Sequence, residues 1–110
     1  MANFIHRGDA IDYTPLGDVS AGDVIQQEDL VAVAKLDISA GTLGSLHVSG
    51  VFDFPKNTGA GEDILAGAQL YWDDVNSVAI NTNAGGEKPL GKATAVAGED
   101  DETVRVRLSQ

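Results

Sequence analysis

Several residue types are absent or scarce in this 110-residue sequence, and cysteine is missing altogether. Disulfide bonds, thiolate zinc sites and cysteine nucleophiles are therefore excluded, and nothing indicates an oxidising compartment. Basic residues are few, because seven Lys and Arg stand against 17 Asp and Glu, for a formal net charge of -10 at pH 7. This charge repels phosphate backbones and anionic lipid headgroups, so neither a nucleic-acid nor a membrane partner is expected. A basic protein partner and a role in solubility alone both stay open.

Long apolar runs are also missing from the chain. No stretch approaches the roughly 18 apolar residues of a membrane span, and residues 1–7 lack the apolar run of a signal peptide. We therefore expect the protein to be made and kept in a cytoplasm, or in a particle assembled there.

Aromatic residues make up only 5% of the sequence, and four of the six lie in two short stretches. Aromatic side chains bury on the order of 150–250 Å² each, so we expect the fold to close around these stretches. The length predicts one domain, residues 1–110, with a modest core. The predicted core residues are Phe52, Phe54, Leu70, Tyr71 and Trp72.

The apolar pattern has the two-residue period of β-strands. It is strict in residues 103–108, where Val104, Val106 and Leu108 are expected inside, and regular in residues 46–54, within one long predicted strand. Residues 69–72 and 77–80 are predicted to form a hairpin. With no convincing helix, the fold class is all-β, a small β-sandwich or β-barrel, preceded by an extended N-terminal arm over residues 1–7.

Residues 86–93 contain the two glycines and the lysine of a phosphate-binding loop at the right spacing. The context does not fit, because a polar loop precedes them, Ala93 replaces the Ser or Thr that would bind magnesium, and the following residues favour a strand. A turn that enters a strand is the favoured interpretation. The acidic groups at residues 73–76 and 99–102 do not follow the spacing of a calcium loop and are interpreted as solvated turns. No cofactor or metal site is assigned.

The two histidines, His6 and His47, lie far apart in the predicted topology and have no recognisable nucleophile beside them, so no catalytic residue is assigned. Arg105 and Arg107 should share one face of the last strand. They either pair with carboxylates of the same sheet or form ion pairs between subunits.

Four segments, in order, resemble a family of small tailed-phage proteins, the capsid cement or decoration proteins, some of which carry a legacy label as recombinases. The segments are residues 50–56 (GVFDFPK), 67–73 (GAQLYWD), 90–93 (LGKA) and 104–108 (VRVRL), and the resemblance extends to the N-terminal arm. It implies a β-rich, non-enzymatic virion protein that binds the outer surface of the expanded capsid and bridges capsomers.

The implied partners are the major capsid protein and further copies of the chain, as a trimer or, alternatively, a dimer. The expected capsid or intersubunit contacts are Asn3, Phe4, Ile5, His6, Arg7, Arg105 and Arg107. Two rival functions stay open: a receptor- or carbohydrate-binding module on the virion surface that uses Tyr71 or Trp72 for stacking, and a nucleotide-dependent recombination protein.

Overall fold

The computed structural model describes residues 2–5 and 8–110, and in these residues it contains nine β-strands and no helix. The predicted all-β class is confirmed. The described part of the chain therefore has no helix long and apolar enough to cross a membrane. The strands are β1 (Ala10–Tyr13), β2 (Val24–Gln27), β3 (Leu30–Val33), β4 (Gly44–His47), β5 (Ser49–Pro55), β6 (Gln69–Asp73), β7 (Val78–Ile80), β8 (Lys88–Ala93) and β9 (Thr103–Ser109).

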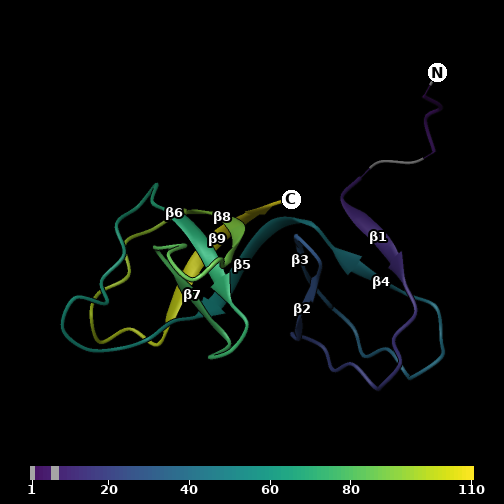
Figure 1. Cartoon of the computed structure of the whole chain (residues 1–110), viewed down its shortest axis with the longest axis horizontal. Coiled ribbons are helices and arrows are strands. Elements are labelled where there is room, and N and C mark those ends of the chain that lie inside the picture. The colour runs from purple at the N-terminus through teal and green to yellow at the C-terminus, as the bar shows by residue number, and fades with distance from the viewer. Residues whose placement is uncertain (1, 6–7) are drawn as a thin grey trace.

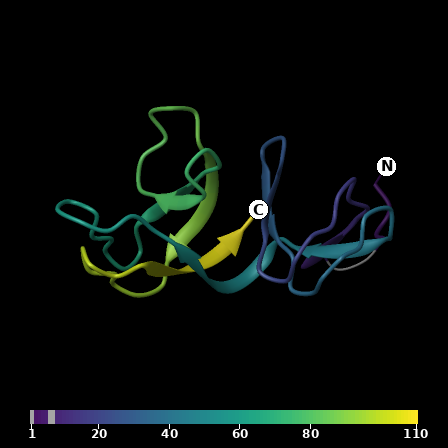
Figure 2. The ribbon, with the colours of Figure 1, turned by 90° about the horizontal axis from the view of Figure 1, so that it is seen from below.

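The strands form two antiparallel sheets that occupy opposite ends of a molecule measuring 44 × 34 × 24 Å (Figures 1 and 2). The N-sheet has the order β1-β4-β3-β2, and the C-sheet has the order β5-β9-β8-β6-β7. The edge strands β5 and β7 approach each other, so the C-sheet is curled.

The long strand predicted over residues 42–54 is divided between the two sheets. β4 ends at His47 and β5 begins at Ser49, with Val48 between them. Val48 donates its backbone N–H to the carbonyl of Asp9, next to β1, and its carbonyl accepts from the N–H of Gln110, next to β9. Its two hydrogen bonds therefore continue the ladders of both sheets. Gly50 has a φ of 119°, which accommodates the change of direction into the C-sheet.

The two sheets repeat one architecture. The order β1-β4-β3-β2 of the N-sheet corresponds, strand by strand, to β5-β9-β8-β6 of the C-sheet. Strand β7 is an addition at the edge of the C-sheet. Backbone hydrogen bonds repeat as well, because Gly22 N–H to Ala34 O (2.6 Å) corresponds to Gly67 N–H to Ala93 O (2.7 Å). The chain is thus a tandem pair of similar four-stranded units.

A short motif, Asp-Val/Ile-x-Ala-Gly, marks this repeat at residues 18–22, 37–41 and 63–67. In the N-sheet unit its two copies face each other through a bridge between Val19 and Ile38. Asp18 accepts a hydrogen bond from Ala40 N–H (2.8 Å), and Asp37 accepts one from Ala21 N–H (2.7 Å). The C-sheet unit has the corresponding bridge between Ile64 and Ala97.

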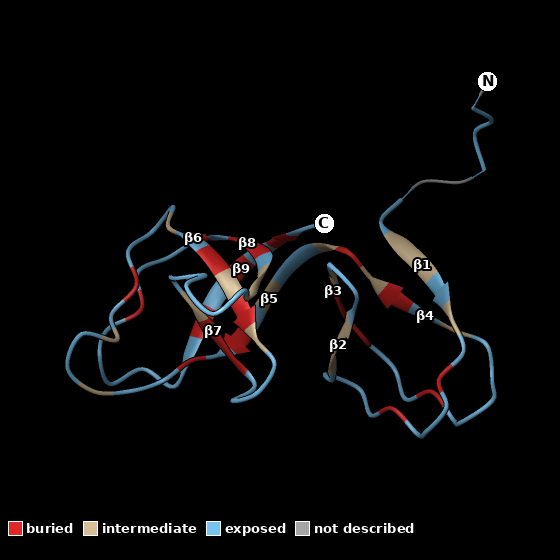
Figure 3. Cartoon of the chain, viewed as in Figure 1, coloured by how far each residue is buried: buried red, intermediate tan, exposed pale blue. Residues whose placement is uncertain are grey.

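Buried residues concentrate in the two sheets and at these bridges (Figure 3). Phe54, Leu70 and Trp72 are buried in the larger cluster, and Phe52 and Tyr71 are half-buried. That cluster also contains Val31 and Val33 of β3, so it spans both sheets. The smaller cluster lies within the N-sheet unit.

Polar contacts add to the junction between the sheets. The side chain of Gln110 accepts a hydrogen bond from Val31 N–H (2.9 Å) and donates to the carbonyls of Pro89 and Leu90 (2.9 Å each). Lys88 of β8 forms an ion pair with Asp29, beside β3, at 2.7 Å. This pair lowers the pKa of Asp29 and raises that of Lys88.

Candidate interaction surfaces

The two arginines of β9 lie on the exposed face of the C-sheet, as the alternation predicts. Arg105 pairs with Asp53 on the neighbouring strand β5, with Nε to Oδ1 at 3.0 Å, and this carboxylate raises the pKa of the guanidinium. Arg107 is also exposed and lies opposite Val51 and Lys92 in the strand register. The pairing of Arg105 within the sheet is one of the two alternatives drawn from the sequence, and a contact between subunits stays a prediction.

Within the predicted N-terminal arm, the structure describes residues 2–5, which lie at the N-sheet end of the molecule, away from both sheets (Figure 1). Its apolar side chains are largely in solvent, since Phe4 is 84% exposed and Ile5 is 81% exposed. Asn3 is exposed as well, and His6 and Arg7 lie outside the described residues. The role of the arm as a contact surface therefore stays a prediction.

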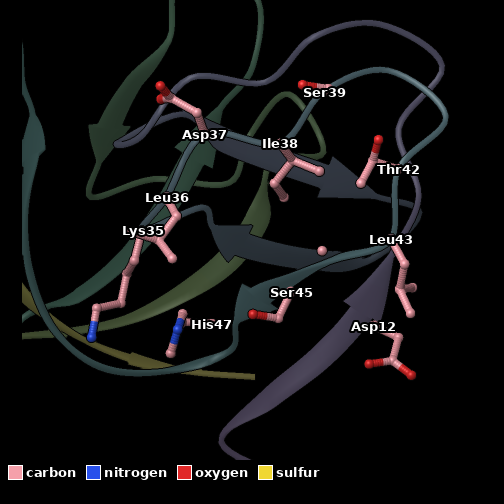
Figure 4. Close-up of a pocket in the computed structure, with 11 residues that line it drawn as sticks. Asp12, Lys35, Leu36, Asp37, Ile38, Ser39, Thr42, Leu43, Ser45 and His47 are labelled. Atoms are coloured by element: carbon pink, nitrogen blue, oxygen red, sulfur yellow. The ribbon is translucent and has the colours of Figure 1, made fainter.

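A groove of about 790 Å³ lies on the N-sheet unit (Figure 4). Its walls carry two leucines with exposed side chains, Leu36 and Leu43, and the polar residues Lys35 and His47 lie on the side of Leu36. This surface was not predicted from the sequence. A usable signal was the apolar pair Leu36 and Leu43, which lies one residue before and two residues after the motif at residues 37–41.

Lys56 is the one buried polar or charged residue among those described. Its ammonium group donates to the carbonyls of Asn57 (2.7 Å), Gly98 (3.0 Å) and Asp101 (2.9 Å). Its neighbours in residues 55–63 are mostly Gly, Pro and polar, a composition that predicts an exposed loop, and for Lys56 this exposure is wrong. The three bonds tie the β5–β6 loop to the acidic turn between β8 and β9, because a buried ammonium needs acceptors around it.

Comparison with families of known proteins matches residues 5–108 to one family, described as phage cement protein. The chain belongs to the phage cement protein family. The match covers both sheets and all nine strands except Ser109, the last residue of β9. Neither a curated protein nor a solved structure matched the chain in the corresponding comparisons. The family gives this cement protein a structural role at the phage capsid.

The remaining sequence motifs lie in a strand and in turns of the C-sheet unit. Residues 88–93, which include most of the phosphate-loop resemblance, form strand β8 rather than a helix. Asp73 caps its own hairpin loop, where it accepts hydrogen bonds from the backbone of Val75 and from Asn76, and these bonds lower its pKa. Within residues 2–5 and 8–110 no group of three or more His, Asp or Glu side chains is arranged to hold a metal ion.

Phe54 and Trp72 of the cement protein pack inside the C-sheet unit. Trp72 is 5% exposed and contacts Phe54 edge-on, with ring centroids 5.9 Å apart. Tyr71 points to the other side of β6 and is half-buried. Trp72 therefore offers no free face on which a sugar ring could stack.

Proposed function

We propose that this cement protein binds the outer surface of the expanded phage capsid and stabilises the head by bridging capsomers. It acts as a homo-oligomer, with a trimer expected and a dimer as the alternative, and it is not an enzyme. The observation that carries the proposal is the family match over residues 5–108. The protein is made in the cytoplasm of the bacterial host and joins the particle there.

The proposed mechanism is avidity across a symmetric lattice. One small domain adds a limited contact area, and the symmetry of the oligomer and of the capsid multiplies it. Many weak contacts then resist the pressure of the packaged DNA together. Two features support contacts with the capsid or with neighbouring copies: the exposed apolar arm at residues 2–5, and the exposed face of β9 that carries Arg105 and Arg107.

Co-sedimentation with capsids tests the proposal. The protein should pellet with expanded capsids and remain in the supernatant with unexpanded ones. Equal binding to both forms, or binding to neither, would contradict it. A variant without residues 2–7 should decorate expanded capsids at reduced occupancy, and full occupancy would remove the arm from the mechanism.

The carbohydrate-binding alternative requires an accessible aromatic residue, so tryptophan fluorescence tests it. Because Trp72 is the only tryptophan and is buried, we expect a blue-shifted emission maximum that resists quenching by iodide and does not respond to sugars. A red-shifted emission that changes on addition of a sugar would favour the binding module instead. The recombinase alternative predicts ATP binding, and we expect none in a calorimetric titration.

A further inference from the structure

A pair of exposed apolar residues lies at the far end of the C-sheet unit. The antiparallel bridge between Ile64 and Ala97 is closed by two backbone hydrogen bonds, of 2.8 and 2.9 Å, and both bridge residues are buried. Antiparallel pairing sets the next residues, Leu65 and Val96, opposite each other, and alternation turns them outward. Leu65 is 67% exposed and Val96 is 66% exposed. We call Leu65 and Val96 the apolar tip.

The repeated architecture shows that the bridge does not require an apolar tip. The corresponding bridge of the N-sheet unit, between Val19 and Ile38, has polar residues at the same two positions, Ser20 and Asp37. The fold of the unit is the same in both cases. The exposed Leu and Val are therefore a property of the surface at this end and not of the fold.

Both loops beside the apolar tip carry several carboxylates. Lys56 and a hydrogen bond from Gly59 N–H to Glu99 O (2.8 Å) hold the two loops together, so these charges belong to one ordered surface. An apolar contact on acidic loops favours a partner segment that is apolar and positively charged. The six acidic residues of the two loops are Glu62, Asp63, Glu99, Asp100, Asp101 and Glu102.

The N-terminal arm has this composition. It presents two exposed apolar side chains, Phe4 and Ile5, and it is followed by Arg7, the only Lys or Arg in the first 34 residues. The arm and the loops of the apolar tip lie at opposite ends of the long axis (Figure 1). Because of this separation, the arm of one copy is suited to reach the tip of another copy.

We propose that the arm of one cement protein docks, through Phe4 and Ile5, on the apolar tip of a neighbouring copy, with Arg7 facing the surrounding carboxylates. The contact is heterologous, since two different surfaces of the chain meet, and such contacts form a ring when the rotation between neighbouring copies closes, as the proposed trimer requires. The inference rests on the proposed homo-oligomer and identifies the surfaces that form it.

Matched pairs of serine substitutions test the contact by sedimentation velocity. F4S/I5S and L65S/V96S should each weaken self-association on the order of tenfold or more, because each removes two apolar groups from one side of the interface. All four positions are exposed, so the circular dichroism spectrum should remain that of the wild type. A wild-type protein that stays monomeric at its highest soluble concentration would overturn the proposal.

The groove of the N-sheet unit is the alternative surface on which the arm of a neighbouring copy could dock, so a variant of the groove serves as the control. L36S/L43S changes two leucines that are 77% and 67% exposed, at a different surface. This variant should associate like the wild type. Loss of association in L36S/L43S, with L65S/V96S unaffected, would overturn the proposal and place the arm in the groove.

Mixing two defective variants tests the direction of the contact. F4S/I5S retains the tip and L65S/V96S retains the arm, so an equimolar mixture should form complexes through one intact arm and one intact tip. Neither variant does so alone. A mixture that remains monomeric would overturn the proposal.

Charge reversal tests the proposed role of Arg7. R7E should weaken association, and the weakening should be largest at low salt because exposed charges are screened as ionic strength rises. Combining R7E with E99K/D100K should restore association. No restoration would overturn the placement of Arg7 beside these carboxylates.

These measurements use the free protein, so they are independent of the capsid. If L65S/V96S and F4S/I5S lose self-association while the wild type sediments with capsids, the arm contact and the proposed function both stand. If the wild type associates as described and does not bind expanded capsids, the arm contact stands and the proposed function fails.

Discussion

At Gly91, strands β8 and β9 leave no room for a side chain. A Cβ atom built there would overlap the carbonyl oxygen of Arg107 on the neighbouring strand, which is backbone and has no freedom to move aside. The register between β6 and β8 also shifts beside it, between Leu70 and Tyr71. This part of the sheet therefore requires the absence of a side chain.

We expect Gly91→Ala to destabilise the protein by about 1–3 kcal/mol or more, the usual cost of forcing extra volume into packed structure. Urea denaturation followed by circular dichroism would measure the loss. Gly17→Ala is the matched control, because a Cβ at Gly17 meets nothing within 4 Å. Equal stability of the two variants would show that the strands separate at little cost.

Lys56 is a second residue that its surroundings make hard to replace, because its ammonium group is buried among carbonyl acceptors. Lys56→Met keeps most of the apolar stem and removes the three hydrogen bonds to carbonyls. We expect a loss of about 1–3 kcal/mol in the free energy of unfolding and faster amide exchange in residues 98–102. Lys92→Met, at an exposed position of β8, should change neither measurement. Unchanged exchange in Lys56→Met would show that the turn is ordered by other contacts.

At the scale of single elements, the hairpin of β6 and β7 depends on the ionised form of Asp73. Its pKa is lowered below the usual 3.8, so the folded state gains stability at a pH above the unfolded value, and this gain is lost as the pH falls through the folded pKa. Asp73→Ala should be less stable than the wild type near neutral pH, and the difference should disappear in strong acid. Thermal denaturation as a function of pH would measure it. Asp74→Ala, in the same loop, is the control, and an Asp73→Ala deficit that did not depend on pH would contradict the argument.

The strands could be predicted from the sequence because their signals are local. Alternation in residues 103–109 gives β9 its buried Val104, Val106 and Leu108, and the turn residues around Gly98 mark where it begins. The partners of each strand could not be predicted in this way. β5 pairs with β9 across some 50 residues of sequence, and no local pattern selects that partner over another strand.

The repeat of the two units has a signal in the sequence, but the signal lies in turns and not in the alternating pattern that predicts strands. Asp-Val/Ile-x-Ala-Gly occurs three times, and each copy reads locally as an ordinary loop. Its structural role is visible only in tertiary contacts, such as the reciprocal hydrogen bonds of Asp18 and Asp37 with the opposite copy of the motif. The surface residues depend on the same contacts: Leu36 and Leu65 look like core residues by type, and only the turn around each motif exposes them.

At the scale of the whole molecule, the two sheets share a core and a polar junction, so we expect one cooperative unfolding transition. Differential scanning calorimetry should show a single peak. Gln110→Ala should lower its temperature, because Val31 N–H loses its partner in a buried position, at a cost of about 1–3 kcal/mol. Ser109→Ala, at the neighbouring exposed residue, is the control. Two separate peaks in the wild type would show that the sheets are independent domains and would contradict the single domain predicted for residues 1–110.

The position of Gln110 between the two sheets matters for the use of such a protein as a carrier of foreign antigens. A cargo peptide joined at Gln110 would lie next to the side chain that bonds Val31 and Leu90 across the junction. The loop between β7 and β8 is a better insertion point, because residues 81–86 are all exposed and lie outside both apolar clusters. Vaccine particles built on this scaffold should therefore carry their epitopes in that loop.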